Sequence, residues 1–280
     1  MNLPAKFKPT PVVAYMFVTG TALLFAASTV VQRGVHEDLP PFGATFWRWF
    51  LAALVLLPIV WRELPSKRAL ISKYWHLILL LGLLLVGCSA IFFLGLNFTT
   101  AINATLINAA QPALTVLPAW LLTRDRITPG QSIGILAALG GIVVMVSQGN
   151  LVVFLALEFN VGDILALAAI LGWTIYATSL HRLPSELGFS VTLFVIFLAG
   201  SLSVLPFYII ESAFFRPMPL SVSAAGIIAF LGIVTSLGGM AMWNAALRTV
   251  GPNRATIFLN LVPVFGVSLA IIFLGEQLFV

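Results

Sequence analysis

The polar side chains that interrupt the long apolar runs of this sequence are the ones that could bind a small molecule. Amide, hydroxyl and aromatic side chains fall near the middle of these runs or slightly to one side of it: Asn108, Gln111, Trp173, Tyr176, Ser236, Trp243, Asn244 and Asn260. Asn108 and Gln111 are one helical turn apart and therefore share a face. Amides and hydroxyls beside aromatic rings suit a neutral or zwitterionic ligand with an apolar part. Hydrogen bonding between helices is the alternative role for any single Ser, Thr or Asn.

Arg48, in the sequence FWRWF, is the one charged residue inside an apolar run. A guanidinium has the geometry to bind the carboxylate of a substrate. Alternatively, its side chain reaches outward to lipid headgroups and pairs with Glu37 or Asp38, while the neighbouring rings anchor the helix at the interface. The sequence favours this second, structural interpretation and leaves the first one open.

Several classes of chemistry lack the residues that they need. No Asp or Glu lies in the middle of an apolar run. His76 and His181 fall near the inner ends of their predicted helices and His36 falls in an outer loop, so no buried group of His and carboxylates is available for a metal site or acid/base work. Cys88 is the single cysteine, and a phosphate-binding GKS/T loop is missing. We therefore expect no enzyme activity, no cofactor, no metal and no ATP hydrolysis by this chain.

The composition requires lipid as the solvent. Of the 280 residues, 60% are hydrophobic and 8% are charged, whereas a soluble domain has about 25% charged residues. The net charge of +5 forms no basic stripe that would bind nucleic acid. The densest basic stretch, WRELPSKRALISK from Trp61, is interpreted as a cytoplasmic loop.

The apolar runs predict helices that cross the membrane. Nine runs have about the 20 residues that a bilayer core requires: 12–32, 42–61, 74–96, 101–123, 131–148, 161–181, 189–210, 221–247 and 254–274. Because the runs are continuous rather than alternating, a membrane β-barrel is excluded. With the N-terminus inside, eleven Lys and Arg residues fall in cytoplasmic segments and two, Arg33 and Arg216, fall outside. This split predicts a multi-pass inner-membrane protein with a cytoplasmic N-terminus.

The chain contains an internal repeat. The sequence ATLINAAQPALTVLPAWLLTRDRI from Ala104 matches ATIFLNLVPVFGVSLAIIFLGEQL from Ala255 at an offset of 151, and Gly87 falls on Gly238 at the same offset. Two repeats of five helices, residues 1–150 and 151–280, have opposite orientations because each repeat crosses an odd number of times. Nine helices are visible, and we expect a tenth beyond the given residues.

Pro112 and Pro263 occupy matching positions in the two repeats. Each proline removes a backbone hydrogen bond and kinks its helix. Broken backbone is tolerated in a membrane where it is buried or faces a watery cavity. Both prolines are therefore predicted to be hinges beside a central cavity.

These features together resemble the drug/metabolite transporter superfamily and its EamA-type exporters. The small-residue helix with Pro112 and the terminal GE of Gly275 and Glu276 carry the resemblance, although the first repeat has RD where GE is usual. The resemblance implies ten helices, inverted repeats, a central cavity and export of small metabolites. The chain looks most like the aromatic amino acid exporters of this family.

The leading hypothesis is a monomeric transporter of small neutral or zwitterionic metabolites, including amino acids, that works down the substrate gradient. An exchanger of phosphorylated metabolites or nucleotide sugars is the first alternative, but it needs more cations than Arg48. A membrane subunit without transport activity, or an intramembrane enzyme, is the second alternative. Under the leading hypothesis, the expected partners of the chain are a small-molecule substrate and the lipid bilayer.

Overall fold

The computed structural model describes residues 10–109, 160–250 and 258–277, together with residues 111, 114, 133, 136 and 140. These residues form helices and contain no strand, which confirms the all-helical prediction for this part of the chain. Within the same ranges, six helical segments are long and apolar enough to cross a membrane: Pro11–Gly34, Pro41–Val60, Trp75–Gly95, Val161–Ser179, Phe189–Phe214 and Val222–Trp243. A shorter apolar helix, Phe258–Leu274, follows them. The predicted helices 101–123 and 131–148 lie mostly outside the described residues.

The helices follow the predicted order closely. In chain order they are α1 (Pro11–Gly34), α2 (Pro41–Val60), α3 (Leu64–Lys73), α4 (Trp75–Gly82), η1 (Leu83–Gly87), α5 (Cys88–Gly95), α6 (Ala101–Ala109), α10 (Val161–Ser179), η2 (Leu180–Arg182), η3 (Ser185–Leu187), α11 (Phe189–Phe214), α12 (Val222–Ala229), η4 (Phe230–Gly238), α13 (Gly239–Val250), η5 (Phe258–Asn260) and α15 (Leu261–Leu274). The basic stretch interpreted as a loop is instead helix α3. Pro65 in its first turn and Lys73 in its last turn are both favoured at those helix positions.

Two of the long helices contain a π-helical segment at matching positions. The segment η1 joins α4 to α5 and ends at Gly87, whereas η4 joins α12 to α13 and ends at Gly238. These two glycines are the pair that coincide at the repeat offset of 151. Hydrophobic patterns do not distinguish a π-helix from an α-helix, so these segments were not predicted. Such segments often occur at functional sites.

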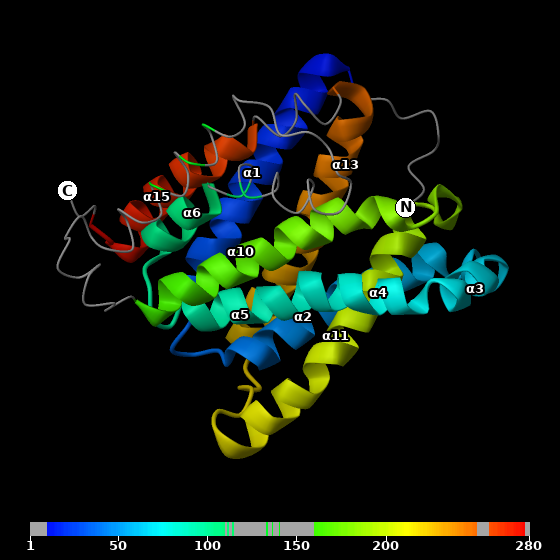
Figure 1. The fold of residues 1–280 in the computed structure, drawn as a ribbon. Helices are drawn as coiled ribbons and strands as arrows, with labels where there is room; N and C mark the ends of the chain where they lie inside the picture. The colour runs from blue at the N-terminus through cyan, green and yellow to red at the C-terminus, as the bar shows by residue number, and fades with distance from the viewer. Residues whose placement is uncertain are drawn as a thin grey trace.

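Several helix pairs join the first half of the chain to the second, and the α2–α11 and α6–α15 pairs are antiparallel (Figure 1). In the α2–α11 pair, Phe42 at the start of α2 stacks on Phe207 near the end of α11. In the α6–α15 pair, Ala101 at the start of α6 contacts Glu276 just after α15. The helix α1 packs against α13 and α15, and α5 packs against α10. Helices α1, α2, α5 and α6 of the first half therefore each pack against a helix of the second half.

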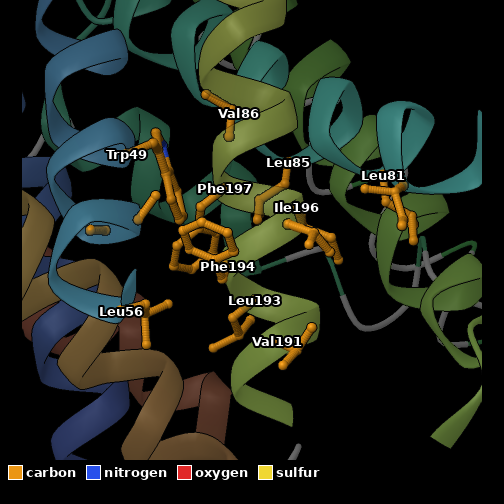
Figure 2. Packing of buried hydrophobic residues seen from close by; sticks show 14 of the residues in the cluster. Trp49, Leu56, Leu81, Leu85, Val86, Val191, Leu193, Phe194, Ile196 and Phe197 are labelled. Atoms are coloured by element: carbon orange, nitrogen blue, oxygen red, sulfur yellow. The ribbon is translucent and has the colours of Figure 1, made fainter. Parts of the chain in front are cut away.

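The largest buried cluster of apolar side chains lies around α2, α4, η1 and α11 (Figure 2). At its centre the rings of Trp49 and Phe197 meet edge to face, with centroids 4.8 Å apart. Gly82 and Gly200 bring α4 and α11 into backbone contact, because a Cβ on Gly82 would lie 2.6 Å from the backbone nitrogen of Gly200. Small residues at such crossings allow close packing where the lipid supplies no hydrophobic driving force.

Candidate functional site

Arg48 is buried inside the bundle. Its residue is 9% exposed, and its Nε donates a hydrogen bond of 2.7 Å to the Oγ of Ser236 in η4. Its Cζ lies 5.1 Å from the centroid of the Trp49 ring. The preferred interpretation from the sequence, a pair with Glu37 or Asp38, is wrong, because the ion pairs of the described residues do not include Arg48. The guanidinium instead points into the bundle, where Ser236 from the second half of the chain accepts its hydrogen bond.

The crossing of α2 and η4 holds Arg48 in this position. A Cβ on Gly232 would lie 2.6 Å from the carbonyl oxygen of Arg48, so the two backbones touch here. One turn further along η4, the hydroxyl of Ser236 donates to the carbonyl oxygen of Leu231 at 2.8 Å. That bond orients the hydroxyl oxygen to accept from Arg48. Two of the predicted site residues, far apart in sequence, are thus brought into direct contact.

Buried polar atoms without a partner gather on the same stretch of α2. The hydroxyl of Thr45 and the indole nitrogen of Trp49 have no hydrogen-bond partner among the described residues. Buried polar groups in native proteins almost always find a partner, which can be water or a ligand. This stretch of α2 therefore has spare hydrogen-bonding capacity.

Sequence reasoning missed Thr45 and Trp49 as candidate site residues. Trp49 was interpreted as an interface anchor together with the other rings around Arg48. The available signal was the spacing, because Thr45 precedes Arg48 by three residues and so lies on the same face of α2. Only the packing of η4 against that face reveals that it is internal.

The predicted aromatic residues of α10 pack against η1 and the large apolar cluster described above. The indole nitrogen of Trp173 donates to the carbonyl oxygen of Leu85 in η1 at 3.1 Å, and its ring centroid lies 5.2 Å from that of Phe92. Tyr176, one turn further on, is buried in the cluster that contains Trp49. Its hydroxyl has no partner among the described residues. Trp173 and Tyr176 are therefore tied to the buried apolar cluster that contains Trp49, whereas no described contact joins them to Arg48 or Ser236.

The remaining predicted residues are placed less centrally or lie outside the described residues. Trp243 is half-buried and packs against Ala14, Val18 and Ala246, and Asn260 is exposed at the end of η5. Asn108 is half-buried in α6, and Gln111 is half-buried and engages a neighbour. The side chain of Asn244 lies outside the described residues. The structure does not bring these five residues into contact with Arg48 in any described interaction.

Of the two predicted hinge prolines, Pro263 lies within the described residues. Pro112 lies outside the described residues. Pro263 lies in the first turn of α15, directly after the 3-10 turn η5. The α-helical ladder is therefore interrupted just before Pro263, as expected when a proline displaces the carbonyl four residues earlier.

A groove of about 470 Å³ lies elsewhere, between α4 and α11. Apolar side chains line it almost entirely, among them Trp75, Leu79, Val195 and Leu202. Trp75, Leu79 and Leu202 are exposed, as expected of residues that face lipid. This groove contains none of the predicted site residues and is not the candidate site. In the described part of the chain, no group of three His, Cys, Asp or Glu residues is placed to hold a metal ion.

The sequence matches a known family over most of its length. Residues 12–147 and 160–280 match the EamA-like transporter family. An uncharacterized transporter of Bacillus subtilis, YyaM, is 28% identical over 89% of this chain and 82% of its own length. An uncharacterized transporter of Archaeoglobus fulgidus is 24% identical over 94% of this chain and 90% of its own length. A solved crystal structure shares the fold with a TM-score of 0.62 at 17% identity, covering 97% of this chain and 91% of its own.

Proposed function

This chain belongs to the EamA-like transporter family, and we propose that it exports small neutral or zwitterionic metabolites by alternating access. Its relatives are named as transporters rather than enzymes, and six apolar helices make it a multi-pass membrane protein. In this proposal the protein acts as a monomer in a bacterial-type inner membrane.

The proposed architecture is a pair of inverted five-helix repeats, residues 1–150 and 151–280, with ten helices in all. It is supported by the directions of the equivalent helices, because α2 runs antiparallel to α11 and α6 antiparallel to α15. Equivalent helices point in opposite directions when one repeat is turned upside down. The matched π-segments that end at Gly87 and Gly238 add a second support. The candidate site lies at a crossing between the two proposed repeats.

The observation that carries the substrate proposal is the buried guanidinium of Arg48. A buried cation without a counter-ion is costly, and membrane proteins place such groups where a ligand or a relay uses them. The planar guanidinium suits the two oxygens of a carboxylate. The rings of Trp173 and Tyr176, which belong to or pack against the buried cluster that contains Trp49, suit an apolar or aromatic side chain. Amino acids, including aromatic ones, combine both features.

Phosphorylated metabolites and nucleotide sugars are less well suited to this site. A phosphate carries up to two negative charges and is usually bound by several cations. Among the described residues, Arg48 is the one buried cation within a membrane-crossing helix. We therefore do not favour an exchanger of phosphorylated metabolites.

The function is tested by counterflow in liposomes that contain only this protein. Liposomes loaded with an unlabelled aromatic amino acid should transiently accumulate labelled amino acid from outside, and a protonophore should leave this exchange unchanged. With equal substrate on both sides, an imposed pH gradient should drive no net accumulation, because no carboxylate at mid-depth is predicted to carry a proton. Protein-free liposomes are the control. Sustained uphill accumulation driven by the gradient would refute transport down the substrate gradient.

The proposed orientation places the N-terminus and Lys67 in the cytoplasm and Glu37 outside. Both side chains are on the surface, and that of Glu37 is 88% exposed. Single cysteines at these two positions, in a Cys88→Ala background, should react differently with an impermeant thiol reagent in intact cells. Cysteine 37 should be labelled and cysteine 67 protected until the cells are opened, because basic loops remain inside. The reverse pattern would invert the topology.

A further inference from the structure

Two carboxylates from the second half of the chain bind the first backbone amides of helices from the first half. Glu211, in the last turn of α11, accepts the amide of Gly43 at 2.8 Å and also the amide of Phe42. Glu276, just after α15, accepts the amides of Ala101 at 2.9 Å and Ile102 at 3.0 Å. Each carboxylate thus completes the start of a helix on the other side of the interface.

The helix starts require these contacts because local residues cannot supply them. The residue before α2 is Pro40, whose side chain forms no cap, and Pro41 has no amide hydrogen. In α6 the hydroxyl of Thr100 accepts the amide of Asn103, which leaves the amides of Ala101 and Ile102 for Glu276. A carboxylate at a helix N-terminus satisfies the free donors and interacts favourably with the helix dipole.

Both contacts lie at the end of the bundle where α2 and α6 begin, hereafter the capped end. A third carboxylate, Asp163 at the start of α10, joins them there. It is 2% exposed and accepts hydrogen bonds from the side chains of Thr99 and Asn103 in the first half of the chain. At the capped end, three carboxylates therefore join the two halves in addition to apolar packing.

In the sequence, each of the two carboxylates has an acidic counterpart at about the repeat offset. Glu63 corresponds to Glu211 at an offset of 148, and Asp125 corresponds to Glu276 at an offset of 151. Glu63 directly precedes α3, which contacts η3 just before the start of α11. Glu63 therefore lies near the helix start that the inverted arrangement assigns to it.

We propose that Glu211 and Glu276 form a latch that closes the capped end, and that both contacts break whenever the transporter opens there. This inference rests on the alternating-access function proposed above, and the proposed orientation places the latch outside. Water can replace the carboxylates on the released amides, since the ends of helices are readily solvated. The carboxylate contacts can therefore close the bundle and can still be replaced by water when it opens. Buried apolar contacts have no such replacement in water.

The latch is tested with two cysteine reporters on α2, placed singly in a Cys88→Ala background. Thr45 and Leu56 are both buried and eleven residues apart, which places them on the same face of α2. Thr45 lies toward the capped end and Leu56 toward the opposite end. Purified protein in nanodiscs, open to a hydrophilic thiol reagent from both sides, is labelled without substrate.

The Glu211→Gln/Glu276→Gln variant should raise the labelling rate at position 45 about tenfold, because the charged caps become weaker neutral ones. The rate at position 56 should not rise. Each single Glu→Gln variant should show a smaller increase in the labelling rate at position 45. If the double variant does not fold, the single variants test the latch. Glu37→Gln removes the same charge from an exposed site at the same end and should change neither rate.

An unchanged rate at position 45 in folded variants would overturn the latch. Equal increases at positions 45 and 56 would also overturn it, because they indicate general loosening from lost helix caps. The assay requires no substrate, so it is independent of the counterflow experiment. A failure of amino acid counterflow would refute the proposed function, while the labelling pattern would still decide whether these carboxylates close the capped end.

Discussion

Replacing Arg48 by methionine is expected to lower kcat/KM for a carboxylate-bearing substrate by about 100-fold. The estimate corresponds to the loss of one charge-assisted contact worth about 2 to 3 kcal/mol. Methionine keeps the length and the packing of the side chain while removing the charge. Initial rates of uptake into proteoliposomes, over a range of amino acid concentrations, measure the effect. The folded state should be at least as stable, because a buried cation that has no ion pair among the described residues has been removed.

The substrate itself provides the matching control. The amide of the same amino acid lacks the carboxylate, so the native protein should carry it poorly and the Arg48→Met variant should no longer distinguish the two compounds. Arg62→Met removes an exposed positive charge next to α2 and should leave the rate unchanged. Equal loss of transport for acid and amide in the Arg48→Met variant would contradict a carboxylate contact and indicate a structural role.

Replacing Gly232 by alanine is expected to impair both stability and transport. The new Cβ would lie 2.6 Å from the carbonyl oxygen of Arg48 and 3.4 Å from its carbonyl carbon. These are backbone atoms and cannot rotate away, so α2 and η4 must separate. Overpacking of this kind typically costs about 1 to 3 kcal/mol. The separation would also stretch the bond between Arg48 and Ser236, and we expect about a tenfold loss of transport. Thermal unfolding and counterflow of the same preparation measure the two effects.

Gly226, six residues earlier in α12, is the matched position for this comparison. A Cβ on Gly226 would meet nothing within 4 Å. Alanine there should stabilise the helix by about 0.5 to 1 kcal/mol, because it lowers the entropy of the unfolded chain. If Gly226→Ala and Gly232→Ala had equal effects, the close crossing at Arg48 would not be what controls stability.

The helices themselves could be predicted closely from the sequence. The expected helix 161–181 is Val161–Ser179 in the structure, and the expected helix 12–32 is Pro11–Gly34. In a bilayer, every backbone group must be paired within its own segment, so a continuous apolar run of sufficient length has few alternatives. The error at α3 has the opposite cause. Short polar segments at the surface are free to be loops or helices, and local start and end signals decide between them.

The candidate site could be predicted only in part. Ser236, Trp173 and Tyr176 stand out in the sequence as polar or amphipathic residues inside apolar runs. The structure places Ser236 in contact with Arg48 of α2, and Trp173 and Tyr176 against the large apolar cluster, while their role in binding stays a prediction. The direction of Arg48 was not predictable, because a long side chain can extend toward headgroups or turn inward at similar cost to the helix. The contact of Ser236 from η4 selects the inward direction. The carboxylate caps of Glu211 and Glu276 were missed for a similar reason, since their partners are backbone amides of no particular residue type.

By itself, the sequence determined the lipid environment, the helical class and the positions of most membrane-crossing helices, and it predicted a duplication of the chain. These properties depend on hydrophobicity summed over about 20 residues and on similarity between distant segments, so neither needs a contact to be known. The tertiary structure alone decided the π-segments, the inward position of Arg48 and the capping of α2 and α6 by Glu211 and Glu276. Each of these depends on a single hydrogen bond or one close backbone crossing. Such contacts are set by how the halves pack together, which no local pattern encodes.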